Sequence, residues 1–342
     1  MRLSRRGGVT AVGLVAGVML DQAIGDPRRG HPVAAFGTVA GKLEAAMWRD
    51  TRGAGLAYAG VLAAAAAGLG VTASRLVASH APSRLKTGRL PAVRLAAATA
   101  VATWAVIGGR TLAAEATAID DLLARGELPA ARQRLTHLVG RKTAHLDEGE
   151  IARAVIESVA ENTSDAVVAP LLWGAVAGLP GLLAYRAVNT LDAMVGHHSP
   201  RYENFGWASA RADDVANYLP ARLTAVLTAA VAPLAGGSGR AALTAWRTDG
   251  HRHPSPNAGV CEAAYAGALG VRLGGRNDYG SHVEDRPVLG GGPGGDGGKA
   301  ATGGDIRRAV RLSRAVTIAA AITCAGIACS RSVAGVTARR KR

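Results

Sequence analysis

The chain has 342 residues, a formal net charge of +15 at pH 7 and only 4% aromatic residues. So few aromatic side chains argue against a large soluble core, whereas small residues let helices pack closely in lipid. The basic residues lie in the termini and loops without interleaved aromatics, which argues against a nucleic-acid-binding surface and predicts that both termini lie in the cytoplasm.

Six apolar runs follow one another along the chain, and several approach the roughly 20 residues that cross a bilayer. They cover residues 9–20, 56–73, 92–109, 166–188, 219–235 and 315–328. An alanine-rich soluble bundle is the alternative, but the runs that begin at residues 56 and 315 contain no charged residue. The sequence therefore predicts an all-α, polytopic integral membrane protein with about four to six membrane helices and polar interfacial helices. We expect one membrane-embedded domain over residues 1–342.

The first run ends in the polar segment LDQAIGDPRRGHPVAAFG, in which two prolines break the helix. Asp26 and His31 are therefore expected near a membrane interface, where they are candidate substrate-binding residues. The simpler alternative makes Asp26 a turn residue and His31 a loop histidine.

Polar helices are expected over residues 110–165. One of them opens near Leu146, where the acidic residues that follow suit the positive end of a helix dipole. On this helix Arg153, Glu157, Glu161 and Asp165 recur every four residues and form one stripe. A solvated face is the alternative, yet three successive carboxylates repel one another unless a cation such as Mg²⁺ balances them.

The apolar run 166–188 is interrupted by the sequence Gly-Leu-Pro-Gly at 178–181. Each half is too short for a full crossing, so we expect a re-entrant helical hairpin. In a hairpin, the carboxylate stripe and the polar stretch after it emerge on the same face of the membrane. If the run crosses instead, the bilayer separates them.

Residues 185–222 concentrate polar side chains between two apolar segments. The adjacent aspartates of a D-D-x-x-N pattern offer oxygen ligands to a hard cation, and nearby arginines suit a phosphate. An N-capping pair ahead of the apolar run at 219 is the alternative, but it explains only one aspartate. The candidates in this stretch are Asn189, Asp192, Arg211, Asp213, Asp214, Asn217 and Arg222.

Asn257 and Glu262 are further candidates, while His251 and His253 resemble a metal-binding pair only superficially. The Gly-rich segment 289–304 is predicted to be a flexible linker. It is not a phosphate-binding loop, because that pattern needs glycine in place of Pro293 and serine or threonine in place of Ala300.

The chain resembles the CobD/CbiB family of cobalamin biosynthesis proteins, the adenosylcobinamide-phosphate synthases. The resemblance rests on four motifs in the order of the family, followed by a final membrane run. They are LDQAIGDPRRGHPVAAFG, ESVAENTSDAVVAPLLW, YRAVNTLDAMVGHHSPRYENFGWASARADDVANYLPARL and SPNAGVCEAAYAGALGVRLGG. These motifs are spread over most of the chain, whereas the Ala-rich spans and the Gly-rich segment match poorly.

The resemblance implies a ligase that joins adenosylcobyric acid, a corrinoid, to (R)-1-amino-2-propanol O-phosphate through an amide bond, with ATP as co-substrate. Such chemistry calls for Mg²⁺ and a general base. The candidate catalytic residues are Glu157, Glu161, Asp165 and Asp192, with Glu157 or Asp192 as the base. The expected metal ligands are Asp213 and Asp214, together with Glu161 or Asp165. The candidate substrate-binding residues are Asp26, His31, Asn162, Tyr185, Asn189, Arg211, Asn217, Arg222, Asn257 and Glu262.

The expected setting is the cell membrane, which the chain crosses several times in contact with lipids, with the active site on the cytoplasmic face. A homo-oligomer or a complex with other enzymes of the cobalamin pathway is compatible with this expectation. A Mg²⁺-dependent intramembrane prenyl- or phosphotransferase is one alternative, but the chain has a single D-D-x-x-N cluster. A non-catalytic corrinoid transporter or regulator is another, although a transporter places its polar groups at the bilayer midplane.

Overall fold

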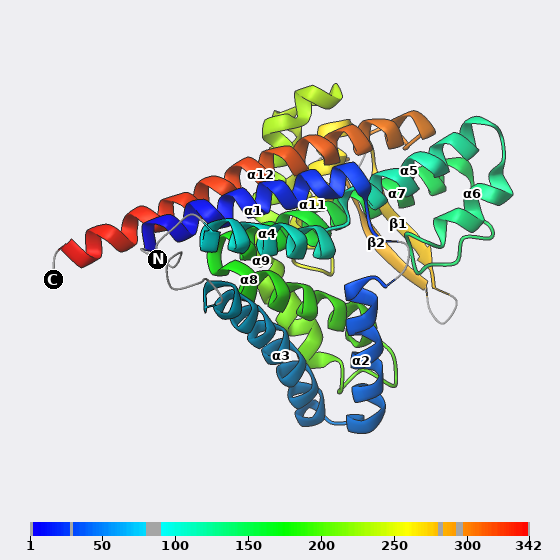
Figure 1. Ribbon diagram of the computed structural model, residues 1–342. Coiled ribbons are helices and arrows are strands. Elements are labelled where there is room, and N and C mark those ends of the chain that lie inside the picture. The colour runs from blue at the N-terminus through cyan, green and yellow to red at the C-terminus, as the bar shows by residue number, and fades with distance from the viewer. Residues whose placement is uncertain (1–2, 28–29, 80–89, 280–282, 292–296, 341–342) are drawn as a thin grey trace. The chain divides into compact units, whose positions relative to one another are not determined.

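The computed structural model describes residues 3–27, 30–79, 90–279, 283–291 and 297–340 (Figure 1). Most of these residues are helical, and six helices are long and apolar enough to cross a membrane, which confirms the predicted all-α, multi-pass membrane fold. The candidate spans are Gly7–Ile24, Arg52–Val77, Leu90–Ala124, Glu148–Gly196, Trp207–Ala235 and Gly303–Arg331.

The chain divides into two compact units, each assembled from separate segments. Unit 1 contains Met1–Gly108, Ala169–Ala216 and Ala320–Arg342, and unit 2 contains Gly109–Val168 and Asn217–Ala319. The predicted functional residues are distributed over both units.

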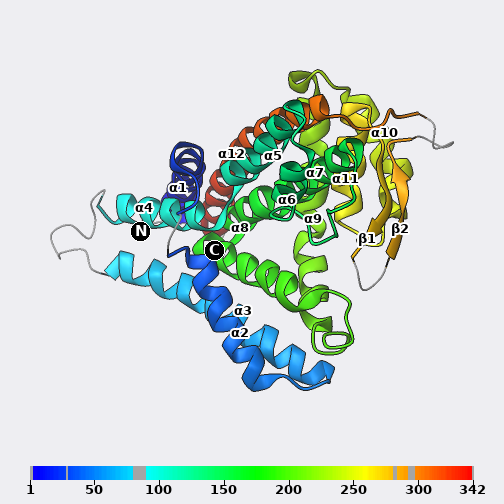
Figure 2. The same cartoon turned by 90° about the vertical axis from the view of Figure 1, so that its right-hand side faces the viewer.

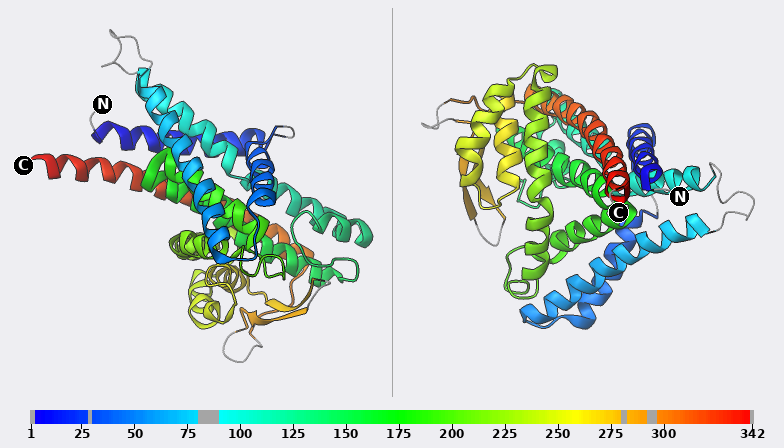
Figure 3. Two further views of the ribbon diagram at one scale, coloured as in Figure 1. Left: turned by 90° about the horizontal axis from the view of Figure 1, so that it is seen from below. Right: turned by 90° about the vertical axis from the view of Figure 1, so that its left-hand side faces the viewer.

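Close helix packing through small residues builds unit 1. Its helices are α1 (Leu3–Ile24), α2 (Pro32–Met47), α3 (Arg52–Ser79), α4 (Leu90–Val106), α8 (Ala169–Leu191), the first part of α9 (Trp207–Val231) and the last part of α12 (Gly303–Arg340). Helix α1 lies along α4, as Figures 1 and 3 show. A side chain at Gly17 would collide with Thr103, so glycine is what permits this close approach.

The expected helical hairpin is present within α8. Gly178 has a φ of 67° and a ψ of −152°, a backbone conformation that is open essentially only to glycine, and Pro180 follows it. A Cβ added at Gly174 would lie 3.4 Å from Leu182 Cδ1, whereas eight residues of straight helix span about 12 Å. The chain therefore turns back at Gly178, and Figure 2 shows the two halves of α8 meeting at an angle.

A fully buried helix, α11 (Ala258–Leu269), lies at the centre of unit 2. Around it the unit contains α5 (Gly109–Ala124), α6 (Leu128–Leu135), α7 (Glu148–Thr163), the remainder of α9, α10 (Gly239–Asp249) and the first part of α12 (Gly303–Arg340). Asp147 caps α7 and forms a capping box with Glu150, which confirms the helix start expected near Leu146.

A β-hairpin in unit 2 departs from the expected all-helical pattern. Strands β1 (Leu273–Asp278) and β2 (Val283–Leu289) pair antiparallel, and the pairing is irregular between Leu273 and Gly275 (Figure 2). The predicted linker 289–304 begins where this hairpin ends, and residues 292–296 lie outside the described residues. Beyond them, Arg272 N donates to Lys299 O, and the Lys299 ammonium pairs with Asp305 at 3.0 Å.

Two short π-helical segments interrupt the helices at predicted catalytic residues. The segment η2 (Ser164–Val168) contains Asp165, and η3 (Asp192–Gly196) begins with Asp192. π-Helical turns are rare in proteins, and those that occur are often found at functional sites. Asp165 and Asp192 therefore lie at positions where the regular helical spacing of the sequence no longer applies.

Candidate functional site

Glu157 on α7 is buried in unit 2, and both of its carboxylate oxygens accept hydrogen bonds. Its Oε1 accepts hydrogen bonds from Gly274 N at 2.8 Å and from Arg153 Nη1 at 3.2 Å, and its Oε2 accepts one from Arg141 Nη2. Arg141 and Arg153 also donate to Asn277 Oδ1 on β1. The side chains of Arg141 and Glu157 are 6% and 4% exposed. The solvated-face alternative is therefore wrong for Glu157, whose contacts are those of an anchor between α7 and the β-hairpin.

The other members of the stripe lie closer to the surface. Glu161, Asn162 and Asp165 are partly buried, and Asn162 Nδ2 donates to Ser158 O at 2.9 Å. Burial, and then the carboxylate of Asp165, raises the pKa of the Cys261 thiol on α11. The carboxylates of Glu161 and Asp165 therefore lie near the buried helix α11.

Glu262 on α11 is 1% exposed and belongs to a pair that sequence reasoning did not identify. Its Oε1 lies 3.9 Å from Nε2 of His253. Burial raises the pKa of the Glu262 carboxyl well above its usual range, and the nearby carboxylates of Glu157 and Glu161 add to the rise. Burial also lowers the pKa of His253, and Arg286 lowers it further. Each group therefore favours its neutral form more than it would in water.

Arg222 and Asn257, both predicted to bind substrate, come together at the start of α11. Arg222 Nη1 donates to Asn257 Oδ1 at 2.9 Å and to Tyr218 O at 3.0 Å, and its guanidinium stacks 3.6 Å from the centre of the Tyr218 ring. Asn217, one residue before Tyr218, is buried. The arrangement holds a planar cation beside the first turn of a helix.

In unit 1 the polar stretch forms a second group. Asn189 Nδ2 donates to Asp213 Oδ1 at 3.3 Å, and Asn189 Oδ1 accepts from Arg186 at 3.2 Å. Arg211 lies 3.8 Å from Asp214. Because α9 already begins at Trp207, the aspartates stand inside the helix, and the alternative that they cap it is wrong.

Asp192 is held by the shape of its π-helical turn. A side chain at Gly196 would overlap the Asp192 carboxylate, so glycine leaves room for the carboxylate where it lies. Tyr185, a predicted substrate-binding residue one helical segment earlier, is buried in unit 1. Of these two side chains, only Asp192 lies in a locally distorted turn.

The residues at the first predicted interface have a local structural role. His31 caps α2, its Nδ1 accepting from Val33 N at 3.2 Å, and its Nε2 lies 3.8 Å from Asp26 Oδ1. The break between α1 and α2 is therefore stabilised by the same histidine that the sequence offered as a substrate ligand.

The predicted magnesium ligands Asp213 and Asp214 lie side by side on α9. Among the residues that the structure describes, no three His, Cys, Asp or Glu side chains are placed to hold a metal ion. Asp213 and Asp214 are neighbours on a helix, so their side chains leave it about 100° apart. The pair could therefore offer one carboxylate to a magnesium ion, whose other ligands would be water and phosphate oxygens.

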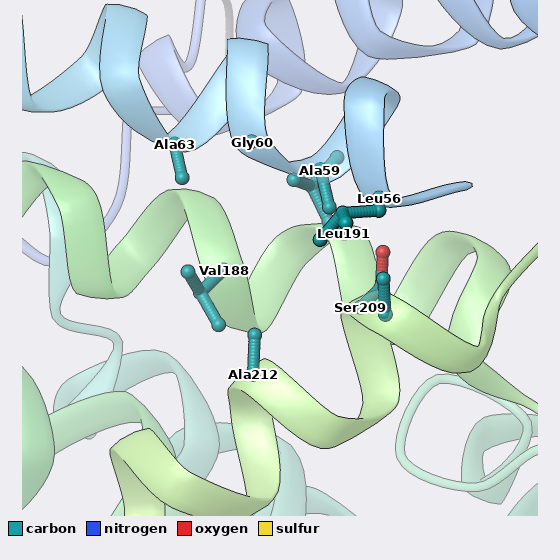
Figure 4. Close-up of a pocket in the computed structure, with 9 residues that line it drawn as sticks. Leu56, Ala59, Gly60, Ala63, Val188, Leu191, Ser209 and Ala212 are labelled. Atoms are coloured by element: carbon teal, nitrogen blue, oxygen red, sulfur yellow. The ribbon is translucent and has the colours of Figure 1, made fainter. Parts of the chain in front are cut away.

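An apolar pocket of about 150 Å³ lies between α3, α8 and α9 in unit 1 (Figure 4). Ser209 is the polar residue in its lining, and its buried Oγ has no hydrogen-bond partner among the described residues. The pocket is lined by Leu56, Ala59, Gly60, Ala63, Val188, Leu191, Ala208, Ser209 and Ala212. Val188 and Ala212 directly precede Asn189 and Asp213, so the pocket adjoins the turns that carry this hydrogen-bonded pair.

Comparison with known proteins adds to this geometry. Residues 14–313 match the family described as CobD/Cbib protein. A Mycobacterium tuberculosis protein named Cobalamin biosynthesis protein CobD is 52% identical over 282 residues, which cover 82% of this chain and 86% of that protein. Proteins of the same name from Geobacter metallireducens and Rhodobacter capsulatus are 45% and 41% identical, over 81% of this chain and 85% and 86% of their own lengths. No solved structure matches the chain. The match over most of its length shows that the chain belongs to the CobD/CbiB family.

Proposed function

We propose that this protein is an adenosylcobinamide-phosphate synthase of cobalamin biosynthesis. The observation that carries the proposal is the similarity to proteins named Cobalamin biosynthesis protein CobD, at 41–52% identity over four fifths of the chain. The reaction joins the free carboxylate of adenosylcobyric acid to the amine of (R)-1-amino-2-propanol O-phosphate. A helical membrane protein with two groups of carboxylates and arginines suits this substrate pair.

The substrate carboxylate must be activated, because a carboxylate and an ammonium ion do not condense in water. In the proposed reaction the substrate carboxylate attacks the γ-phosphorus of ATP, which forms an acyl phosphate and releases ADP. The amine, after losing a proton, attacks the acyl carbon, the C–O bond to phosphate breaks, and inorganic phosphate leaves. A bound magnesium ion would neutralise phosphate charge during activation. Cations and a general base are the groups that the chain itself must supply.

Unit 1 offers residues for the activation half of the reaction. Asp213, whose Oδ1 accepts from Asn189, is the metal ligand assigned from the aspartate pair, because Arg211 lies 3.8 Å from Asp214. Asp192 lies in a π-helical turn that fixes its carboxylate beside Gly196. These assignments make Asp213 and Asp192 the first two residues to substitute.

The proposal is tested with purified protein in detergent, supplied with adenosylcobyric acid, aminopropanol phosphate and Mg-ATP. Mass spectrometry is expected to detect the amide product, with one ADP formed per amide. Asp213→Asn should lower kcat/KM by at least about 100-fold, the scale on which charge-stabilising groups act. Glu203→Gln is the matched control, because Glu203 is exposed in the loop before α9 and pairs with exposed His198.

Three outcomes separate the alternatives. Failure of the wild-type protein to form the amide, under conditions in which an authentic synthase does, would remove the ligase function. Corrinoid accumulation in vesicles without amide formation would favour the transporter. Normal turnover of Asp213→Asn would leave the ligase in place and remove the metal ligand.

A further inference from the structure

The apolar pocket of unit 1 runs along one face of α3, close to the start of that helix. On this helix it is lined by Leu56, Ala59, Gly60 and Ala63. These residues recur every three or four positions, which is the spacing of a single helical face. Arg52 is the first residue of α3 and precedes Leu56 by four residues, so it belongs to the same face. An arginine therefore lies about one helical turn beyond the pocket.

This end of unit 1 has the side chains of a membrane–water interface. Two of the candidate membrane spans begin with Arg52 and Trp207, and the Arg52 guanidinium lies over the Trp207 ring, 5.3 Å from its centre. Arg201 lies over the ring of Trp48 in the same way, at 4.7 Å. Tryptophan is enriched at membrane interfaces, where arginine reaches the lipid headgroups. The pocket, one turn further inside, therefore lies where the acyl chains begin.

The charge of Arg52 is available to an anion at this surface. In the part of the chain that the structure describes, Arg52 contacts an aromatic ring and no carboxylate pairs with it. The acidic residues before it have other partners, since Glu44 accepts from Arg201 Nη2 at 3.0 Å and Asp50 accepts from Asn204 Nδ2 at 3.0 Å. Arg52 also begins a helix of 28 residues, whose dipole favours an anion at this end. A phosphate is the anion that a guanidinium binds best.

A buried hydroxyl group faces the pocket from α9. Ser209 is 1% exposed, and its Oγ has no hydrogen-bond partner among the described residues. Figure 4 shows this oxygen pointing from α9 toward α3. Because a buried hydroxyl without a partner is costly, a hydrogen-bond acceptor from a ligand is expected beside it.

The volume and the rim of the pocket limit what enters it. At about 150 Å³ the pocket is too small for a corrin macrocycle, whereas an apolar cavity of about this size stays dry and accepts a small apolar molecule. Leu56 on its rim is 62% exposed, and Gly60 is exposed as well. In a multi-pass membrane protein, an apolar rim of this kind meets lipid. A segment of an acyl chain therefore fits the pocket in size, polarity and access.

We propose that this pocket binds one acyl chain of a membrane phospholipid, with Ser209 Oγ donating to the ester carbonyl of that chain and Arg52 binding the phosphate. Arg52 begins its span, Ser209 is the third residue of its own, and the apolar lining follows. A phospholipid presents phosphate, ester and hydrocarbon in this same order. The lipid lies beside the Asn189–Asp213 pair and takes no part in the reaction, so the site does not depend on the proposed ligase activity.

The site is tested with purified protein in dodecyl maltoside and a phosphatidylglycerol that carries a diazirine near the start of one acyl chain. After illumination, peptide mass spectrometry should find the label concentrated on residues 56–63 and 208–212. Gly60→Leu fills the pocket and should remove most of this label. Gly68→Leu is the matched control, because a Cβ at either glycine meets nothing within 4 Å and both lie on the exposed face of α3.

Thermal unfolding shows whether these variants are folded and still bind. Phosphatidylglycerol that binds the native protein raises the midpoint of unfolding in proportion to its occupancy. Wild type and Gly68→Leu should show this rise, and Gly60→Leu should lose it while its midpoint without lipid stays at or above that of wild type.

The two polar contacts are tested by native mass spectrometry, which gives the dissociation constant of phosphatidylglycerol. Ser209→Ala should weaken binding about 2- to 10-fold, the worth of one neutral hydrogen bond. Arg52→Gln should weaken it about fivefold. Ser199→Ala is the control for the first, because its Oγ also lacks a partner among the described residues but lies outside the pocket lining. Arg49→Gln is the control for the second, because it removes an exposed charge that precedes α3.

Three results would overturn the proposal. An even spread of label over the exposed face of α3, unchanged in Gly60→Leu, would remove the site. Equal competition by dodecyl maltoside and phosphatidylglycerol, with unchanged affinity of Ser209→Ala and Arg52→Gln, would leave a pocket for any alkyl chain without recognition of the headgroup. Displacement of the lipid by adenosylcobyric acid would assign the pocket to a corrinoid side chain. The lipid measurements contain no ATP or amine, so a failure of the ligase function leaves their result unchanged.

Discussion

At the scale of single residues, the buried glutamates of unit 2 differ in whether both carboxylate oxygens have hydrogen-bond partners. Glu157 accepts hydrogen bonds from Gly274, Arg153 and Arg141, so both of its oxygens have partners inside the protein. Glu262, on the neighbouring helix, retains an oxygen without a hydrogen-bond partner among the described residues. Two buried glutamates of similar exposure thus differ in how far the protein satisfies their hydrogen-bonding capacity.

Removing Glu157 should therefore destabilise the protein. Glu157→Ala leaves Arg141 buried without its carboxylate, and breaking a buried pair in this way costs about 3–5 kcal/mol. Thermal unfolding in detergent should show a lowered midpoint. Glu127→Ala removes a carboxylate from an exposed pair with Arg125, worth at most about 1 kcal/mol, and serves as the control. Equal shifts in the two variants would contradict the anchor role.

Residue types and spacing predicted part of the site. The Arg153–Glu157 pair, the contact of Asn189 with Asp213 and that of Arg222 with Asn257 join residues that the sequence had already selected. Arg141, Asn277 and His253 were not selected, because each reaches its partner through a loop or a hairpin. The distance along the chain from Arg141 to Asn277 is 136 residues, and no local pattern encodes such a meeting.

At the scale of elements, the break in α8 was predictable and its consequence can be measured. Gly178→Ala places a Cβ on a backbone conformation that is essentially confined to glycine, at a cost of about 1–3 kcal/mol. The midpoint of thermal unfolding should fall accordingly. Gly68→Ala on α3 is the control, because a Cβ there meets nothing within 4 Å and alanine is favoured over glycine in a helix by about 0.5–1 kcal/mol, so this change should not destabilise the protein. A harmless Gly178→Ala would mean that the turn does not depend on this conformation.

The β-hairpin was not predicted, because the local sequence does not favour its strands. Strand β1 contains Gly274 and Gly275, which weaken a strand, and β2 contains Pro287, so the local sequence argues against both. Contacts with α7 stabilise the hairpin instead, since Arg153 donates to Gly274 O and Arg276 O. The apolar runs, by contrast, were found because their helices need only length and composition to be recognised.

At the scale of the whole molecule, the proposed reaction predicts on which side of the membrane the basic segment 125–142 lies. Mg-ATP is available inside the cell, and the segment 125–142 carries five basic residues, Arg125, Arg132, Arg134, Arg141 and Lys142, as cytoplasmic loops do. A cysteine at position 127, made in a protein whose exposed Cys329 is replaced by serine, tests this. Glu127→Cys should react with a membrane-impermeant maleimide only after the membrane is opened. Labelling of intact cells would place this segment outside and exclude a cytoplasmic site there.

The division of α12 between the two units has a consequence for how the protein is made. Residues 303–319 of this helix belong to unit 2 and residues 320–340 to unit 1, where Arg331 donates to Ala175 O. Until α12 has been translated, both units lack their part of this helix, and neither can reach its final packing. The insertion of this one helix therefore contributes to the packing of both units.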